Sequence, residues 1–148
     1  TVGLEMLEAE PDLDMLVIAV GGGGLIAGIA TAAKALQPGI EIVGVQTTRF
    51  PAMFNAIKGT QHVQGTSTIA EGIAVGTPGQ VTQAIIADKV DDLVLVDEGD
   101  IEQAIVMLLE IEKTLVEGAG AAGLAAPPQY TARVAGKKNR AGVVGAEY

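Results

Sequence analysis

The chain of 148 residues contains no cysteine and no tryptophan, and it has only two tyrosines and two phenylalanines. The lack of cysteine excludes disulfides, thiolate metal sites and a cysteine nucleophile within these residues. It is also compatible with the cytoplasm, where we expect the protein to work. Because hydrophobic residues make up 49% of the chain, we expect a folded core built from alanine, valine, isoleucine and leucine.

Basic residues are also few. The chain has nine lysines and arginines and 18 aspartates and glutamates, which gives a net charge of −9. A nucleic-acid surface needs clustered basic side chains, so we expect no nucleic-acid partner. A short basic group lies near the end of the chain, at Arg133, Lys137, Lys138 and Arg140, and we interpret it as solvated.

Long apolar runs are missing as well. No stretch approaches the roughly 20 residues that a membrane-spanning helix needs, and no charged-then-apolar leader opens the chain. We therefore expect no membrane partner. The 148 residues are enough for one domain with a substantial core.

Short apolar runs alternate with helical patterns along the chain. Three runs are apolar at consecutive positions, which is typical of parallel strands buried on both faces: 15–20, 41–46 and 93–96. Helical patterns cover the first dozen residues and then 25–36, 51–58, 80–89, 98–113 and 118–126. The alternation predicts an α/β fold with an open, mostly parallel, doubly wound sheet. Residues 59–79 are predicted to form a long loop, which is usually functional or mobile.

Four consecutive glycines, Gly21 to Gly24, lie between the first strand and the helix over 25–36. Glycine lets the backbone adopt left-handed conformations and lets a ligand approach bare N–H groups closely. Unpaired amides at a helix start, together with the positive end of the helix dipole, form an anion site. The sequence therefore predicts a phosphate site at this junction.

Three kinds of phosphate ligand are conceivable. A nucleotide P-loop requires a lysine after its last glycine, but Ile29 follows Gly28. A dinucleotide fingerprint can be drawn through Gly22, Gly24 and Ala27, yet the next strand ends in Gln46, Thr47 and Thr48 without the acid that binds ribose. The third ligand is pyridoxal 5′-phosphate, and further motifs favour it.

Four segments carry a family resemblance: 20–30 (VGGGGLIAGIA), 68–73 (TIAEGI), 90–96 (VDDLVLV) and 116–122 (VEGAGAA). In this order and spacing they resemble the serine/threonine dehydratase family of fold-type II pyridoxal-phosphate enzymes, which includes serine racemase. The nearest resemblance is to threonine dehydratase. It implies that residues 1–126 form part of the large cofactor-binding domain, and that 127–148 are a divergent basic segment.

The resemblance also implies roles for individual residues. The backbone N–H groups of Gly21, Gly22, Gly23, Gly24 and Leu25 would hold the cofactor phosphate. Gly72 would lie beside the cofactor ring, and Glu117 would stand in the active-site wall near the reactive end. The implied reaction is α,β-elimination from threonine or serine, which gives a 2-oxo acid and ammonia.

Without the resemblance, the acidic residues and the histidine of this sequence have ordinary structural interpretations. Glu117 could be a surface acid at a helix end, and Glu71 could cap a helix or face solvent. His62 is the only histidine, lies in a polar stretch and is interpreted as solvated. The acids Glu98, Asp100 and Glu102 suit the first turn of a helix.

Two parts of the family pattern are missing. Neither the S-x-K-type segment with the cofactor-binding lysine nor the S-x-G-N-H-type loop occurs. The partner of the ring nitrogen cannot be assigned either. We therefore expect a partial chain that is catalytically silent in isolation and binds the cofactor weakly. Gln46 and Ala52 stand where some relatives carry acidic cation ligands, so we predict no metal site.

Two alternative hypotheses stay open. The chain could be a catalytically inactive assembly or regulatory module of the same fold, or it could have serine racemase-type activity. In each case a truncated parallel sheet leaves unpaired strand edges. We therefore expect a homo-oligomer, or association with the missing remainder of the enzyme.

Overall fold

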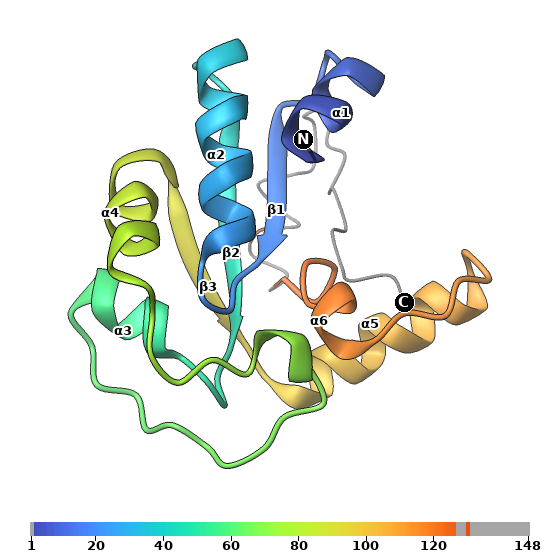
Figure 1. The fold of residues 1–148 in the computed structure, drawn as a ribbon. Helices are drawn as coiled ribbons and strands as arrows, with labels where there is room; N and C mark the ends of the chain where they lie inside the picture. The colour runs from blue at the N-terminus through green and yellow to red at the C-terminus, as the bar shows by residue number, and fades with distance from the viewer. Residues whose placement is uncertain (1, 127–129, 131–148) are drawn as a thin grey trace.

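The computed structural model describes residues 2–126 and 130 (Figure 1). Three parallel strands form one sheet in the order β1-β2-β3, with Met15 paired to Glu41 and Val43 to Asp92. The strands are β1 (Met15–Ala19), β2 (Glu41–Thr47) and β3 (Asp92–Val96). The helices are α1 (Val2–Ala9), α2 (Gly24–Leu36), α3 (Ala52–Lys58), α4 (Gln80–Lys89), α5 (Glu98–Glu110), α6 (Gly118–Ala121) and the single 3₁₀ turn η1 (Glu71–Ile73). The predicted α/β fold with a parallel sheet is confirmed.

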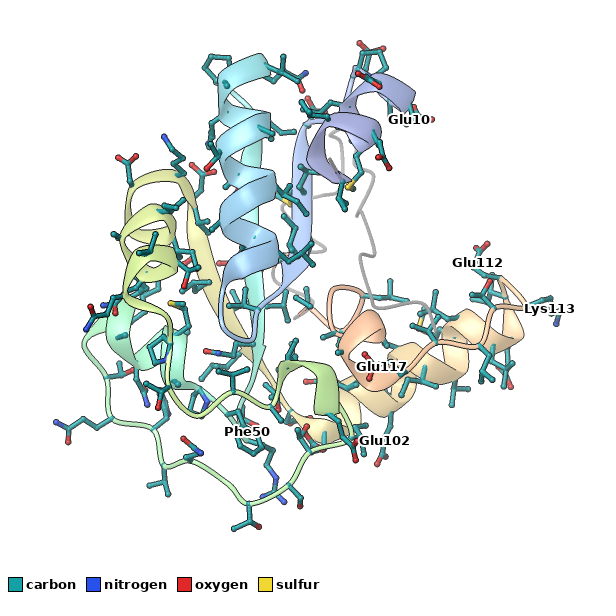
Figure 2. All side chains as sticks on the ribbon, viewed as in Figure 1. Glu10, Phe50, Glu102, Glu112, Lys113 and Glu117 are labelled. Carbon is teal, nitrogen blue, oxygen red and sulfur yellow. The ribbon has the colours of Figure 1, made fainter. Side chains whose placement is uncertain are left out.

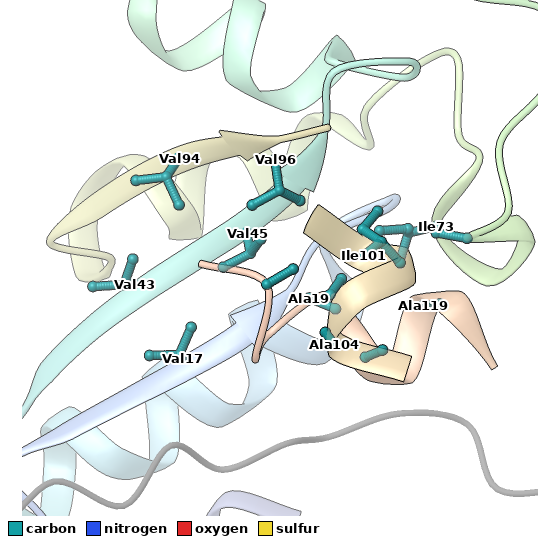
Figure 3. Packing of buried hydrophobic residues seen from close by; sticks show 14 of the residues in the cluster. Val17, Ala19, Val43, Val45, Ile73, Val94, Val96, Ile101, Ala104 and Ala119 are labelled. Atoms are coloured by element: carbon teal, nitrogen blue, oxygen red, sulfur yellow. The ribbon is translucent and has the colours of Figure 1, made fainter. Parts of the chain in front are cut away.

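Helices cover both faces of the sheet, which explains why each strand has apolar residues at consecutive positions; the polar exceptions, Glu41, Gln46, Thr47 and Asp92, lie near strand ends. One face packs against α5, α6 and η1 through alternate strand residues (Figure 3): Val17, Ala19, Val43, Val45, Val94 and Val96. The other face packs against α1 to α4 through the intervening residues: Leu16, Ile18, Val20, Ile42 and Leu93. Each strand therefore contributes to two separate cores.

Two predicted helices end earlier than expected. The helix predicted over 98–113 stops at Glu110, because Lys113 adopts a left-handed φ of 57° and the N–H of Thr114 turns back to the carbonyl of Leu108, at 3.1 Å. The helix predicted over 118–126 is regular only to Ala121, after which the N–H of Leu124 donates to the carbonyl three residues before it. The first helix ends at Ala9, close to the predicted stop at Pro11.

The long segment 59–79 is irregular, as predicted, except for the turn η1. Its first part is tied back to neighbouring elements. The N–H of Gly65 donates to the carbonyl of Arg49 at 2.7 Å, and the side-chain amide of Asn55 donates to the carbonyl of His62 at 2.9 Å. His62 itself is exposed and contacts the ring of Phe54 edge-on. The loop therefore runs across the end of the sheet where the strands finish (Figure 1).

The predicted basic segment 127–148 lies outside the described residues, apart from Tyr130, so its boundary stays a prediction. Tyr130 is buried in the same core cluster as residues of α5 and α6, and its hydroxyl donates to the carboxylate of Asp92. Within residues 2–126, none of the helices is both long enough and apolar enough to cross a bilayer.

Two glycines give a matched test of this packing. A methyl group on Gly44, in the middle of β2, would lie 2.9 Å from Ile26 Cδ1 and from Val20 Cγ2, and closer still to Leu93. All three side chains are buried, so we expect Gly44→Ala to lower the free energy of unfolding by about 1–3 kcal/mol. Gly28 is exposed within α2 and has open space around its Cα.

Gly28→Ala should raise stability by about 0.5–1 kcal/mol, because alanine has the better helix propensity. Urea denaturation of both variants measures the two effects. Equal changes for the two substitutions would contradict the packing described for β2.

Candidate functional site

The glycine run forms the junction between β1 and α2, at the carboxyl end of the sheet. Gly23 is the N-cap of α2 and adopts the left-handed conformation, with φ 89° and ψ 0°. Its carbonyl accepts the N–H of Ala27 at 3.0 Å and so begins the helix. A residue with a Cβ is strained in this conformation. The turn therefore explains why glycine stands at this position.

The amides of this turn are unpaired. Within the described part of the chain, the N–H groups of Gly21 through Leu25 donate no hydrogen bond. These five residues line one cavity of about 250 Å³. Unpaired N–H groups at the start of a 13-residue helix carry partial positive charge and suit an anion.

The turn is held from behind by α4. The hydroxyl of Thr82 donates to the carbonyl of Gly22 at 2.7 Å and also lies 3.0 Å from the carbonyl of Gly79. A methyl group on Gly23 would lie 2.8 Å from Met53 Cε and 2.9 Å from Ile86 Cδ1. The sequence did not indicate these contacts, since Thr82 is 60 positions from Gly22 and belongs to no recognised motif.

Ala19, at the end of β1 just before the turn, also lines the cavity. The other walls come from distant segments: Gly72 and Ile73 of η1, Glu117, and Ala119 of α6. All seven residues named as a candidate site by the sequence, Gly21 to Gly24, Leu25, Gly72 and Glu117, therefore line the same cavity. A methyl group on Gly72 would lie 3.0 Å from both Ala119 Cβ and Glu117 Oε1, so η1 and α6 approach closely only because position 72 has no side chain.

Glu117 contributes a carboxylate to this cavity wall (Figure 2). It is the N-cap of α6, and its carbonyl accepts the N–H of Ala121 at 3.1 Å. Its Oε1 atom is buried and has no hydrogen-bond partner among the described residues. Buried polar atoms normally have partners, so this oxygen is available to a ligand in the cavity.

Glu98, the first residue of α5, joins three segments near this end of the sheet. Its Oε1 accepts from the hydroxyls of Thr68, at 2.7 Å, and Thr47, at 3.1 Å, while Oε2 accepts from the N–H of Ile69 at 2.8 Å. Partial burial is the largest single influence and raises the pKa of Glu98. The three hydrogen bonds and the nearby charge of Arg49 outweigh it and hold this pKa below its ordinary value.

The described lysines lie elsewhere. Lys34 pairs with Asp91, Lys58 with Asp92, and Lys89 with Asp88, while Lys113 donates to the carbonyl of Glu110. None of these four side chains lines the cavity. Covalent attachment of a cofactor through a lysine therefore has no candidate among residues 2–126.

The absence of a metal site stays a prediction. Gln46 is fully buried, and its amide oxygen accepts the N–H of Phe54 at 2.8 Å, which gives this side chain a structural role at the start of α3. Among residues 2–126 and 130, no group of three His, Asp or Glu side chains is arranged to hold a metal ion.

Comparison with known proteins gives consistent matches. A family model described as "Pyridoxal-phosphate dependent enzyme" matches residues 1–145. The L-threonine ammonia-lyase of Thermotoga maritima is 44% identical over 128 residues, which cover 85% of this chain and 32% of that protein. The catabolic L-threonine dehydratase of Escherichia coli K12 is 42% identical over 129 residues, covering 85% of this chain and 39% of that protein.

A solved structure also matches. Maize serine racemase superposes with a TM-score of 0.88 at 34% sequence identity, over 99% of this chain and 47% of that chain. The chain thus spans about a third of the length of the curated relatives that it matches.

Alanine substitutions at Gly23 and Gly24 distinguish a position where the turn requires glycine from one where it does not. Gly23→Ala adds a methyl group to a left-handed residue, and that methyl group would collide with Met53 and Ile86, so we expect a loss of about 1–3 kcal/mol in unfolding free energy. Gly24 is exposed and helical, and a methyl group on it would have no neighbouring atom within 4 Å. Gly24→Ala should change stability by less than about 0.5 kcal/mol. Thermal unfolding compares the pair, and a Gly23→Ala protein as stable as the Gly24→Ala protein would disprove the strained turn.

Proposed function

The chain belongs to the family of pyridoxal-phosphate dependent enzymes, and we propose that the protein containing it is a threonine or serine dehydratase, that is, an ammonia-lyase. The observation that carries this proposal is the single cavity lined by the glycine turn, with its unpaired amides, and by η1 and Glu117. The relatives named threonine ammonia-lyase and threonine dehydratase support the choice of reaction.

The cofactor phosphate would be held by the N–H groups of Gly21 to Gly24 and Leu25. Hydrogen bonds to a charged group contribute roughly 1.5–3 kcal/mol each. Five unpaired donors at the N-terminus of α2 therefore fit a phosphate dianion. Their lack of bulky side chains lets the anion contact the backbone directly.

Gly72 would lie beside the cofactor ring, and its missing side chain keeps that wall of the cavity open. Glu117 would face the reacting end, where its unpaired Oε1 can accept a proton or a hydrogen bond from the substrate. When bound, pyridoxal phosphate supplies the electron-withdrawing ring that allows threonine or serine to lose its β-hydroxyl group and yield a 2-oxo acid and ammonia. The chain's own residues bind, orient and shield the reactants.

The 148-residue chain alone should be catalytically silent, because none of its described lysines reaches the cavity. Held through its phosphate alone, the cofactor would bind with about −4 kcal/mol, or roughly millimolar affinity.

Two alternatives remain. The likeness to maize serine racemase favours racemization as the second candidate reaction. An inactive assembly or regulatory module of the same fold is the third hypothesis, and ammonia release by the longer protein distinguishes it from the enzyme.

Cytoplasmic location and an oligomeric state remain predictions. Within the described residues β1 and β3 are the edges of the sheet, where the rest of the enzyme or a second copy could pair.

One substitution tests the backbone cradle directly. Leu25→Pro removes a single N–H from the turn at the second residue of α2, where proline is tolerated. We expect pyridoxal phosphate affinity to fall by roughly 10- to 150-fold, the equivalent of one charged hydrogen bond. Leu25→Ala is the control, since it removes the same side chain and keeps the N–H. The measurement is a fluorescence titration in the protein that contains this chain, with ammonia release from threonine as a second readout.

Three results have different meanings. Loss of affinity in Leu25→Pro but not in Leu25→Ala supports the cradle. Equal affinities in both variants would refute it. Tight cofactor binding without ammonia or racemized product would favour the inactive module.

A further inference from the structure

The Glu98 carboxylate accepts hydrogen bonds from two segments that are distant in sequence. Thr47 ends β2, whereas Thr68 and Ile69 belong to the long 59–79 loop. We infer that Glu98 is a positioning residue: it holds the 68–73 segment against the carboxyl end of the sheet and thereby places the η1 wall of the cavity.

A continuous set of contacts leads from Glu98 to the cavity. The Thr68 hydroxyl donates to Glu98 and accepts the N–H of Ala70 at 3.1 Å. Ala70 is fully buried, and its carbonyl accepts the N–H of Ile73 at 3.1 Å, which forms the η1 turn. Gly72 and Ile73 of that turn line the cavity. The cavity wall at Gly72 therefore lies only four positions after the anchor at Thr68.

The same anchor also sets the position of α6. A methyl group on Gly118 would overlap the backbone carbonyl of Ile69 and would lie 2.9 Å from the Cα of Ala70. The first residue of α6 thus rests directly on the backbone that Glu98 holds. Because Glu117 precedes Gly118, the two cavity walls outside the glycine turn depend on one anchored segment.

Helix capping does not account for Glu98. The capping box of α5 is formed by Asp97 and Asp100, whose side chains each accept a backbone N–H from the other residue. A first-turn acid without further partners would point into solvent, as Glu102 does on the next turn (Figure 2). An ionised carboxylate only accepts hydrogen bonds, so it matches three donors better than a neutral side chain would. The low pKa of Glu98 agrees with that role.

The placement of the 68–73 segment stands on the contacts alone, and its effect on the cofactor rests on the proposed function. Glu98→Ala removes all three hydrogen bonds and leaves the capping box intact. Glu102→Ala is the matched control on the same helix. We expect the Ile69 amide to exchange with solvent at least about tenfold faster in Glu98→Ala, with exchange in β3 unchanged, and pyridoxal phosphate to bind about tenfold more weakly.

The measurements are residue-resolved hydrogen exchange and a fluorescence titration with pyridoxal phosphate, in the protein that contains this chain. A second pair, Thr68→Val and Thr68→Ser, separates loss of the hydroxyl from loss of a methyl group. The serine variant should restore cofactor affinity to near the wild-type value.

Unchanged exchange at Ile69 in Glu98→Ala would overturn the inference, as would exchange that speeds up equally in β3. Faster local exchange with unaltered cofactor affinity would also overturn it, while leaving the proposed function intact. If the unsubstituted protein binds no pyridoxal phosphate, the proposed function fails. The exchange measurement then still decides whether Glu98 holds the segment.

Discussion

The structure depends on one left-handed residue. Gly23 lets β1 turn directly into α2, and Gly23 is packed so closely against α3 and α4 that no side chain fits at this position. A buried parallel strand must leave the sheet at its carboxyl end, and a helix must then start without pairing its first amides. The glycine turn meets both requirements within four residues. It thereby leaves a row of donors along the cavity, and the other walls are assembled around it.

The turn suits an anion because two of its carbonyl groups have partners and, within the described chain, its N–H groups do not. The carbonyl of Gly22 is occupied by Thr82, and the carbonyl of Gly23 by the first hydrogen bond of α2. The N–H groups of the same residues have no partner in the described chain. A ligand that meets this surface therefore finds donors and few free acceptors. Phosphate, which accepts hydrogen bonds on several oxygens, is a better match than a neutral group.

Much of this arrangement was predictable from the sequence, because its causes are local. Consecutive apolar residues indicated strands buried on both faces, and the glycine run indicated a turn from strand to helix with unpaired amides; the anion site there stays a prediction. The family resemblance implied that Gly72 and Glu117 lie near the cofactor, and both line the cavity. Without the resemblance, Glu117 could equally be interpreted as a surface acid. Membership of the family and the parallel α/β fold are both confirmed.

What the sequence did not indicate lies in contacts between distant segments. The sequence interpretation of Glu98 was a first-turn acid, because nothing in the pattern links it to Thr68, 30 positions earlier. Thr82 was not singled out at all. The end of α5 at Glu110 depends on a left-handed lysine, which residue preferences do not favour. The contacts of Glu98 and Thr82 appear only when distant segments are brought together at the carboxyl ends of the strands.

One wall of the cavity carries hydrogen-bond donors and another carries an acceptor, and this difference limits which ligands fit. Backbone donors line the glycine turn, whereas the wall beside η1 carries the unpaired Oε1 of Glu117. A small anion would be attracted to the first wall and gain nothing from the second. A ligand that also reaches Glu117 must carry an anionic group at one end and a hydrogen-bond donor or positive charge at the other. A phosphorylated cofactor engaged with an amino acid has that polarity, so the two walls together favour it over phosphate alone.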